Sequence, residues 1–132
     1  MEAFVGKWKL DSYENVDAIL NMLSFTDEEK EALLSNVVLE LQIPKENTVK
    51  IHSNSNLFQQ EFVFPVNEEF QTVSADGTSL RGIVEKISDT KLTYTQKHPI
   101  LRVTATSEIL NKANILTINF LGKKSTFKFQ KI

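Results

Sequence analysis

Few residues in this 132-residue chain have the types and spacing that chemistry requires. His52 and His98 are the two histidines, and the chain contains no cysteine, which excludes disulfides and thiolate metal sites. A metal site would therefore depend almost wholly on carboxylates. The serines lack plausible His and Asp partners, and the sequence has no glycine-rich phosphate loop or nucleophile elbow. We expect no catalytic residue, no metal site and no cofactor.

Arginine is scarce in the chain. Arg81 and Arg102 are the two arginines among 15 basic residues. Arginine is the usual bidentate partner of a buried carboxylate or phosphate, so a site for an anionic ligand has few possible anchors. The net charge of −2 favours neither nucleic acid nor an anionic membrane, and we expect no nucleic-acid partner.

A cluster of lysines lies near the C-terminal end of the sequence, at Lys123, Lys124, Lys128 and Lys131. The simpler interpretation is a solvated outer surface. The alternative is transient docking onto anionic lipid headgroups, which salt would weaken. The acidic stretch "TDEEKE" (26–31) argues against contact between an anionic membrane and that part of the chain.

The elements that would position these residues are those of an ordinary globular domain. Hydrophobic residues make up 41% and charged residues 24%, values typical of a soluble chain. We expect one domain over residues 1–132, with no internal repeat or linker. No apolar run approaches the ~20 residues that span a bilayer. The start "MEAFVGKWKL" lacks the pattern of a signal peptide, which favours a cytoplasmic location.

Alternation and helical spacing predict one strand, a pair of short helices and then many strands. Residues 4–10 alternate as a strand does, with Phe4, Gly6, Trp8 and Leu10 on one face. Residues 15–23 carry apolar side chains at helical spacing. A second helix begins after Thr26, where Glu29 three residues later indicates a capping box.

From residue 37 onward, short apolar runs are separated by turn residues at intervals of about 8–12 residues, which is typical of a sandwich or barrel. The pattern predicts about ten antiparallel strands, enough to close into a barrel that holds a ligand. A helix pair between the first two strands would cover one open end. In the last stretch, "KSTFKFQKI" (124–132), Phe127 and Phe129 share the inner face.

Three stretches carry a resemblance to a known family. "AFVGKWKL", the following "ENVD" and "EEFQTVSADGTSL" resemble the intracellular lipid-binding proteins, which include the cytoplasmic fatty-acid-binding and retinoid-binding proteins. The resemblance runs along nearly the whole chain. It implies a calycin-like, ten-stranded up-and-down barrel with a helix-turn-helix lid and an internal cavity for one or two lipids.

The chain departs from this family at the residues that hold a fatty-acid carboxylate. Typical members use an arginine on the eighth strand and an Arg-x-Tyr pair on the last strand. These positions fall on Ser107, Phe127 and Phe129, and a further arginine near the lid falls on Thr78. By alternation, Arg81 and Arg102 face outward, although a bulge could turn either one inward.

We therefore expect the cavity to favour apolar lipids with neutral or weakly polar head groups. An acid could still bind with its carboxylate in water near the lid. Polar residues expected to face inward could bond a hydroxyl directly or through water. Plain core packing remains the alternative for each apolar candidate. The predicted ligand-binding residues are Ile19, Met22, Phe25, Leu33, Ser53, Leu57, Asp76, Gln96, Ala105, Ser107, Leu116, Ile118, Phe120, Phe127 and Phe129.

Two function classes stay open at this point. The first is a non-enzymatic, monomeric carrier of a long-chain fatty acid or neutral lipid, with the helix pair opening as a portal. The second is a degenerate barrel whose cavity has partly closed and which acts as a structural or protein-interaction module. An enzyme is the least expected class, because no acid, base and nucleophile occur together.

Overall fold

The chain forms a single ten-stranded antiparallel sheet that curls into a nearly closed barrel, as the alternation and the family resemblance predicted. The computed structural model covers residues 1–132 and describes all of them except 18–19, 21–25, 57–58, 74–78 and 98–101. The described elements are the 3₁₀ helix η1 (Glu2–Phe4), the helix α2 (Asp27–Leu34) and the strands β1 (Gly6–Glu14), β2 (Val38–Lys45), β3 (Thr48–Asn54), β4 (Gln59–Pro65), β5 (Glu69–Val73), β6 (Ser79–Ser88), β7 (Lys91–Lys97), β8 (Val103–Leu110), β9 (Ala113–Phe120) and β10 (Lys123–Lys131).

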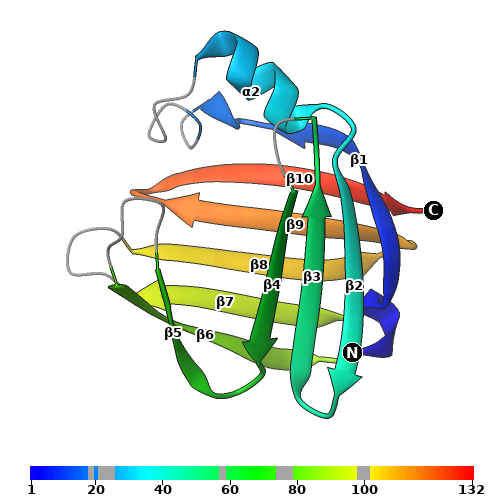
Figure 1. Cartoon of the computed structure of the whole chain (residues 1–132), viewed down its shortest axis with the longest axis vertical. Helices are drawn as coiled ribbons and strands as arrows, with labels where there is room; N and C mark the ends of the chain where they lie inside the picture. The colour runs from blue at the N-terminus through cyan, green and yellow to red at the C-terminus, as the bar shows by residue number, and fades with distance from the viewer. Residues whose placement is uncertain (18–19, 21–25, 57–58, 74–78, 98–101) are drawn as a thin grey trace.

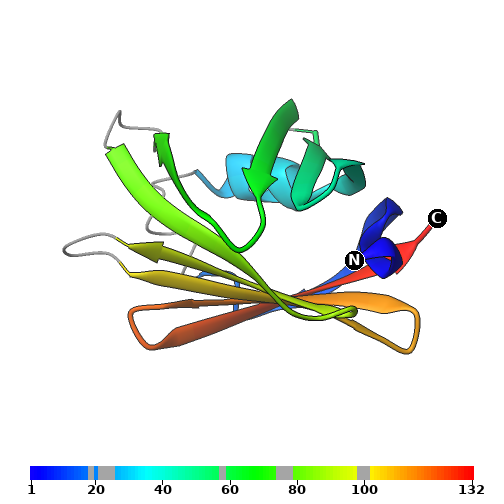
Figure 2. The ribbon, with the colours of Figure 1, turned by 90° about the horizontal axis from the view of Figure 1, so that it is seen from below.

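The strand order is β4-β3-β2-β1-β10-β9-β8-β7-β6-β5. Strands that follow one another in sequence are therefore paired, except β4 and β5, and β1 pairs with β10 as well as with β2. Figure 1 shows β2–β4 running across the face of β7–β10, and Figure 2 shows these two layers from below. The first and last strands therefore join the two layers, while β4 and β5 lie at the two ends of the strand order.

Tight two-residue turns connect β8 to β9 and β9 to β10. Asn111 and Lys112 join β8 to β9 with φ of 49° and 66°, and Leu121 and Gly122 join β9 to β10 with φ of 48° and 77°. Two consecutive residues with positive φ give a two-residue hairpin loop whose twist matches that of the flanking strands. These loops fix the register that sets which side chains point inward.

One end of the barrel is filled by side chains. Phe4, Trp8, Leu41, Leu92 and Phe129 form the buried core cluster. The Trp8 indole Nε1 donates to the Phe4 carbonyl at 2.9 Å, which ties η1 to β1. The strand predicted over residues 4–10 therefore begins later, at Gly6, because residues 2–4 turn across the end of the barrel. Phe4 and Trp8 are both buried, as the alternation predicted.

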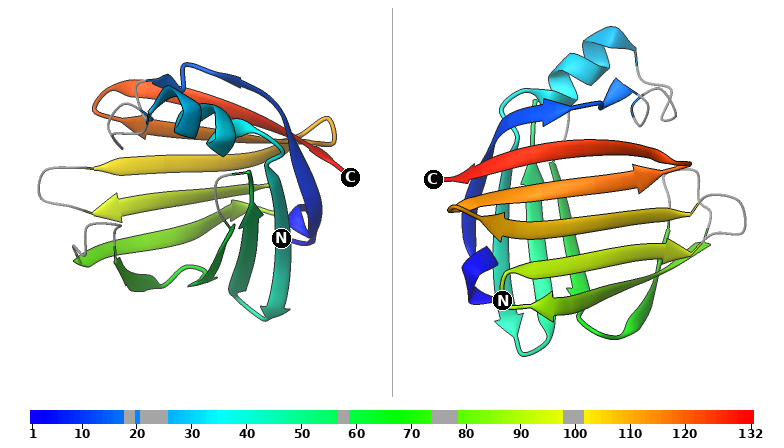
Figure 3. Two further views of the ribbon diagram at one scale, coloured as in Figure 1. Left: turned by 45° about the horizontal axis from the view of Figure 1, so that its top comes forward. Right: turned by 180° about the vertical axis from the view of Figure 1, so that it is seen from behind.

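The helix α2 lies at the other end of the barrel (Figures 1 and 3). Its capping box is present as predicted: Glu29 N donates to Thr26 Oγ1, and Thr26 N donates to Glu29 Oε1, both at 3.1 Å. No residue of α2 is fully buried. Most of the helix predicted over 15–23 lies outside the described residues. Among described helices, none is long and apolar enough to cross a membrane.

Candidate functional site

A cavity of about 580 Å³ lies between the two layers of the barrel. This volume is within the range of pockets that hold small molecules, about 300–1,000 Å³. Its walls come from β2, β3, β4, β6, β7, β8, β9 and β10. The lining residues are Leu39, Leu41, Val49, Ile51, Ser53, Phe62, Phe64, Leu80, Val84, Leu92, Thr93, Tyr94, Gln96, Ala105, Ser107, Asn114, Leu116, Ile118 and Phe129.

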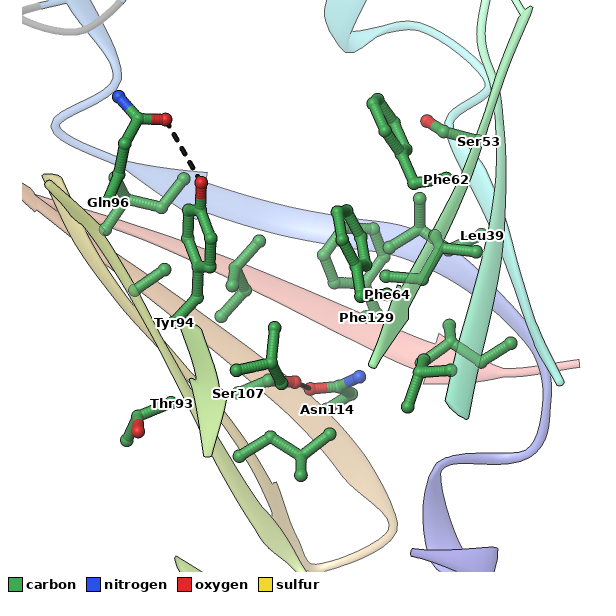
Figure 4. Close-up of a pocket in the computed structure, with 18 of the residues that line it drawn as sticks. Leu39, Ser53, Phe62, Phe64, Thr93, Tyr94, Gln96, Ser107, Asn114 and Phe129 are labelled. Carbon is green, nitrogen blue, oxygen red and sulfur yellow. Dashed lines mark hydrogen bonds between the residues drawn. The ribbon is translucent and has the colours of Figure 1, made fainter. Parts of the chain in front are cut away.

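The cavity wall contains no charged side chain among the described residues. Its polar groups are also unevenly distributed. The wall formed by β2–β4 carries one polar residue, Ser53, whereas β7–β9 contribute Thr93, Tyr94, Gln96, Ser107 and Asn114. Figure 4 shows the last four of these side chains on one wall, opposite Leu39, Phe62 and Phe64. The site is thus an apolar cavity in which one wall can form hydrogen bonds.

The inner polar group is a pair formed by two adjacent strands. Ser107 Oγ on β8 donates to Asn114 Oδ1 on β9 at 2.6 Å. Asn114 is only 3% exposed, and it lies beside Phe129 in the β9–β10 ladder. Since Phe129 belongs to the cluster that fills one end of the barrel, this pair lies toward that closed end.

The second polar pair lies on β7. The Tyr94 hydroxyl donates to Gln96 Oε1 at 3.1 Å (Figure 4), and Gln96 is half-buried. Burial raises the pKa of the Tyr94 hydroxyl, because the phenolate would lose hydration. Gly82 makes room for this ring: a Cβ at residue 82 would lie 2.8 Å from Tyr94 Cε2.

Aromatic rings connect β4 to β5, where no ladder of hydrogen bonds joins the described parts of the two strands. Phe62 and Phe64 stack with ring centroids 5.8 Å apart, and Phe64 contacts Phe70 of β5 at 5.0 Å. Phe70 in turn stacks on Tyr94 at 6.2 Å. Between the described parts of these strands, ring contacts therefore take the place of backbone hydrogen bonds.

The predicted ligand-binding residues are placed in three groups. Ser53, Gln96, Ala105, Ser107, Leu116, Ile118 and Phe129 line the cavity. Leu33, Phe120 and Phe127 are not among the lining residues. Leu33 is partly buried on α2, Phe120 is buried, and Phe127 packs against the core cluster. Ile19, Met22, Phe25, Leu57 and Asp76 lie outside the described residues, as does Thr78. Whether the lining residues bind a ligand stays a prediction.

Neither arginine is directed into the cavity. Arg81 on β6 and Arg102 just before β8 are both exposed, in agreement with the alternation of their strands. His52 lies 3.7 Å from Glu61 on the surface. The described residues contain no group of His, Asp and Glu side chains suited to hold a metal ion.

The other lining residues were not predicted from the sequence, and they include Asn114, Tyr94, Phe62 and Phe64. A signal for Asn114 was available, because it alternates in phase with Leu116, Ile118 and Phe120 and is the one polar residue on that face of β9. Phe62 and Phe64 also alternate around Val63. Their strand was harder to interpret, because it begins with three polar residues, Gln59, Gln60 and Glu61.

Known proteins match the chain over most or all of its length. No protein-family model matches the chain. A fatty acid-binding protein of Clonorchis sinensis is 30% identical over 132 residues, which covers 99% of each chain. Fatty acid-binding protein type 3 of Fasciola hepatica is 29% identical over 133 residues and covers 100% of both.

Solved structures share the fold at lower identity. A Schistosoma mansoni fatty acid binding protein in complex with arachidonic acid matches with a TM-score of 0.85 and 22% identity, covering 100% of this chain and 98% of that one. The fatty-acid-binding protein 1 of Echinococcus granulosus matches with a TM-score of 0.84 and 20% identity, covering 100% and 99%.

Proposed function

The chain belongs to the fatty-acid-binding proteins of the intracellular lipid-binding family, and from this premise we propose that it is a non-enzymatic carrier of apolar lipids with uncharged head groups. In this proposal residues 1–132 act as one monomeric domain in the cytoplasm. The lipid occupies the internal cavity, and the residues that line it, Ser107 and Phe129 among them, form its binding site.

The observation that carries the proposal is the absence of a cation from the described cavity wall. Ser107 and Phe129 line the cavity at two of the positions where relatives that bind acids would place an arginine and a tyrosine. An ionised carboxylate buried there would lose its hydration without gaining a charged partner, which costs several kcal/mol. A neutral head group avoids this cost.

Burial of the lipid's hydrocarbon chain favours binding even without a cationic residue to bind the head group. Each buried methylene contributes about 0.8 kcal/mol, so ten of them contribute roughly 8 kcal/mol before the costs of binding. A charge-assisted hydrogen bond contributes about 1.5–3 kcal/mol. Loss of the anchor therefore lowers the affinity for an acid by about one to two orders of magnitude and leaves the affinity for an alcohol or ester intact.

The test compares oleate with oleyl alcohol, which share one hydrocarbon chain and differ in the head group. Displacement of a neutral fluorescent probe is measured well above the pKa of the carboxyl group. We expect the alcohol to bind more tightly than the ionised acid. Clearly tighter binding of oleate under these conditions would contradict the preference for neutral head groups.

A matched pair of variants tests whether a cation on the cavity wall is what raises the affinity for an acid. Ser107→Arg places a guanidinium on the cavity wall and should raise oleate affinity by about tenfold or more relative to the alcohol. Thr104→Arg introduces the same charge on the same strand, but residue 104 does not line the cavity. It should leave the ratio of the two affinities unchanged. An equal gain in both variants would mean that long-range attraction, and not an anchor in the cavity, governs acid binding.

A further inference from the structure

The two polar pairs in the cavity share one pattern of hydrogen bonding. In each pair a hydroxyl donates to the carbonyl oxygen of an amide: Ser107 to Asn114 at 2.6 Å, and Tyr94 to Gln96 at 3.1 Å. A side-chain amide has one carbonyl acceptor and an NH₂ group with two donors. Because the hydroxyls bond the carbonyl oxygens, the NH₂ donors of each amide remain available for another partner.

Of the two amides, that of Asn114 is the more deeply buried. Its Nδ2 has no hydrogen-bond partner within the described part of the chain, although the residue is only 3% exposed. No fully enclosed side-chain nitrogen or oxygen lacks a partner in that part of the chain, so this nitrogen borders the open space of the cavity. Figure 4 shows it directed away from Ser107, toward the space between the two walls.

An unpaired donor at this depth determines which ligand fits. A pure hydrocarbon that displaces water from the cavity would leave the Asn114 N–H groups without an acceptor, which costs about 1–3 kcal/mol. A ligand with an acceptor at this point avoids the cost. Gln96 imposes a weaker requirement, because it is half-buried and is the last residue but one of β7, where water competes for its amide.

We propose that Asn114, oriented by Ser107, is the head-group site of the cavity and that it selects uncharged lipids with a hydrogen-bond-accepting carbonyl, such as an ester, ketone or aldehyde. The head group then enters first and lies toward the end that Phe4, Trp8 and Phe129 fill. Asn114 contacts the ligand, and Ser107 is a positioning residue that holds the amide with its NH₂ group toward the carbonyl. This inference rests on the proposed carrier function and narrows its ligand class.

The test uses 2-tridecanone and tridecane, which have the same number of carbons and differ in the carbonyl oxygen. Displacement of N-phenyl-1-naphthylamine, a neutral probe without a carbonyl group, gives the two affinities for the full-length protein. We expect the ketone to bind about threefold to tenfold more tightly than the alkane in the native protein. In Asn114→Leu the preference should disappear, because the alkane no longer leaves an amide unpaired.

Two further variants separate the inner pair from the outer one. Gln96→Leu removes the other amide and should keep the ketone preference. Ser107→Ala leaves the Asn114 amide in place but frees it to rotate, so the preference should shrink without vanishing. This variant also provides a test if Asn114→Leu does not fold. The infrared carbonyl stretch of the bound ketone gives a direct readout: it should lie at the hydrogen-bonded frequency in the native protein and at the free frequency in Asn114→Leu.

The possible outcomes are distinct. An equal ketone preference in the native protein and in Asn114→Leu would overturn the inference and leave the carrier function standing. A preference lost in Gln96→Leu but kept in Asn114→Leu would also overturn it, by assigning the selection to the outer pair. If neither ligand displaces the probe, the carrier function itself fails, and this inference fails with it.

Discussion

Two buried polar side chains show how differently this fold uses hydrogen bonds at the scale of single residues. Ser125 on β10 is 0% exposed, and its Oγ donates to the Asn15 carbonyl at 2.5 Å. Asn114 is 3% exposed, but its Nδ2 has no partner among the described residues. The serine thus has a purely structural bond, which holds β10 to the chain that leaves β1. The asparagine keeps a donor available for a ligand.

Tyr94 gives a pH-dependent prediction at the same scale. Burial raises the pKa of its hydroxyl above the ordinary value of 10.0, because the folded state favours the neutral phenol. The contribution of Tyr94 to stability is therefore fully present below pH 10 and is lost as the pH rises through the raised pKa. In Tyr13→Phe, which leaves Tyr94 as the remaining tyrosine, phenolate absorbance should develop above pH 10 in the folded protein.

Binding of an apolar ligand should move this titration further upward, because the ligand displaces water from around the ring. The control is the same variant unfolded in denaturant, which should titrate near the ordinary value. A folded-state midpoint at or below that of the unfolded chain would show that the Tyr94 hydroxyl is well hydrated and that the cavity is wetter than its apolar lining implies.

At the scale of elements, side-chain rings and no backbone ladder join the described parts of β4 and β5. The ring centroids of Phe64 on β4 and Phe70 on β5 lie 5.0 Å apart. Replacing Phe70 with Ala removes this contact and the stacking of Phe70 on Tyr94. Since Phe70 does not line the cavity, we expect ligand association and dissociation to accelerate together while the equilibrium affinity changes little.

Stopped-flow mixing with the neutral probe measures both rates. Val63→Ala is a suitable control, because Val63 is an exposed apolar residue of β4 that does not line the cavity. It should leave the rates unchanged. Unchanged rates in Phe70→Ala as well would contradict passage of the ligand between β4 and β5 and favour a route near α2.

The elements themselves were largely predictable, while their contacts were not. Alternation predicted about ten strands, and the Thr26–Glu29 pair predicted the start of α2, because both signals are local in sequence. The start of β1 was placed too early, since the bond from Trp8 Nε1 to the Phe4 carbonyl depends on a turn that alternation does not encode. The same limit applies to the site: an inward polar residue such as Asn114 is visible in the alternation, but its bond to Ser107 requires the β8–β9 register.

For the molecule as a whole, the cavity decides between a carrier and an empty scaffold. A volume of about 580 Å³ remains open, and Phe129 is one of the residues that line it. A ligand that binds only the folded state stabilises it by about 2.7 kcal/mol at a concentration 100-fold above its Kd. We therefore expect oleyl alcohol to raise the thermal midpoint by several degrees.

The companion measurement is solvent extraction of the purified protein followed by mass spectrometry. A carrier should release an uncharged lipid in near-stoichiometric amount. A protein that carries no lipid, binds no probe and shows no thermal stabilisation would fit the structural or protein-interaction module. The two measurements together separate an unloaded carrier, which still binds added ligand, from a barrel that does not bind lipid at all.

The position of β1 between β2 and β10 has a consequence for how the protein is made. During synthesis β1 precedes β10, so one edge of β1 stays unpaired until residues 123–131 are made, more than a hundred residues later. The Asn15 carbonyl likewise gains its bond from Ser125 only then. Contacts of such long sequence separation close slowly, and an unpaired strand edge invites association with other chains. A ribosome-bound chain would thus expose the cavity wall until its last strand is released. On the proposed carrier function, we expect lipid to bind only after β10 has paired with β1.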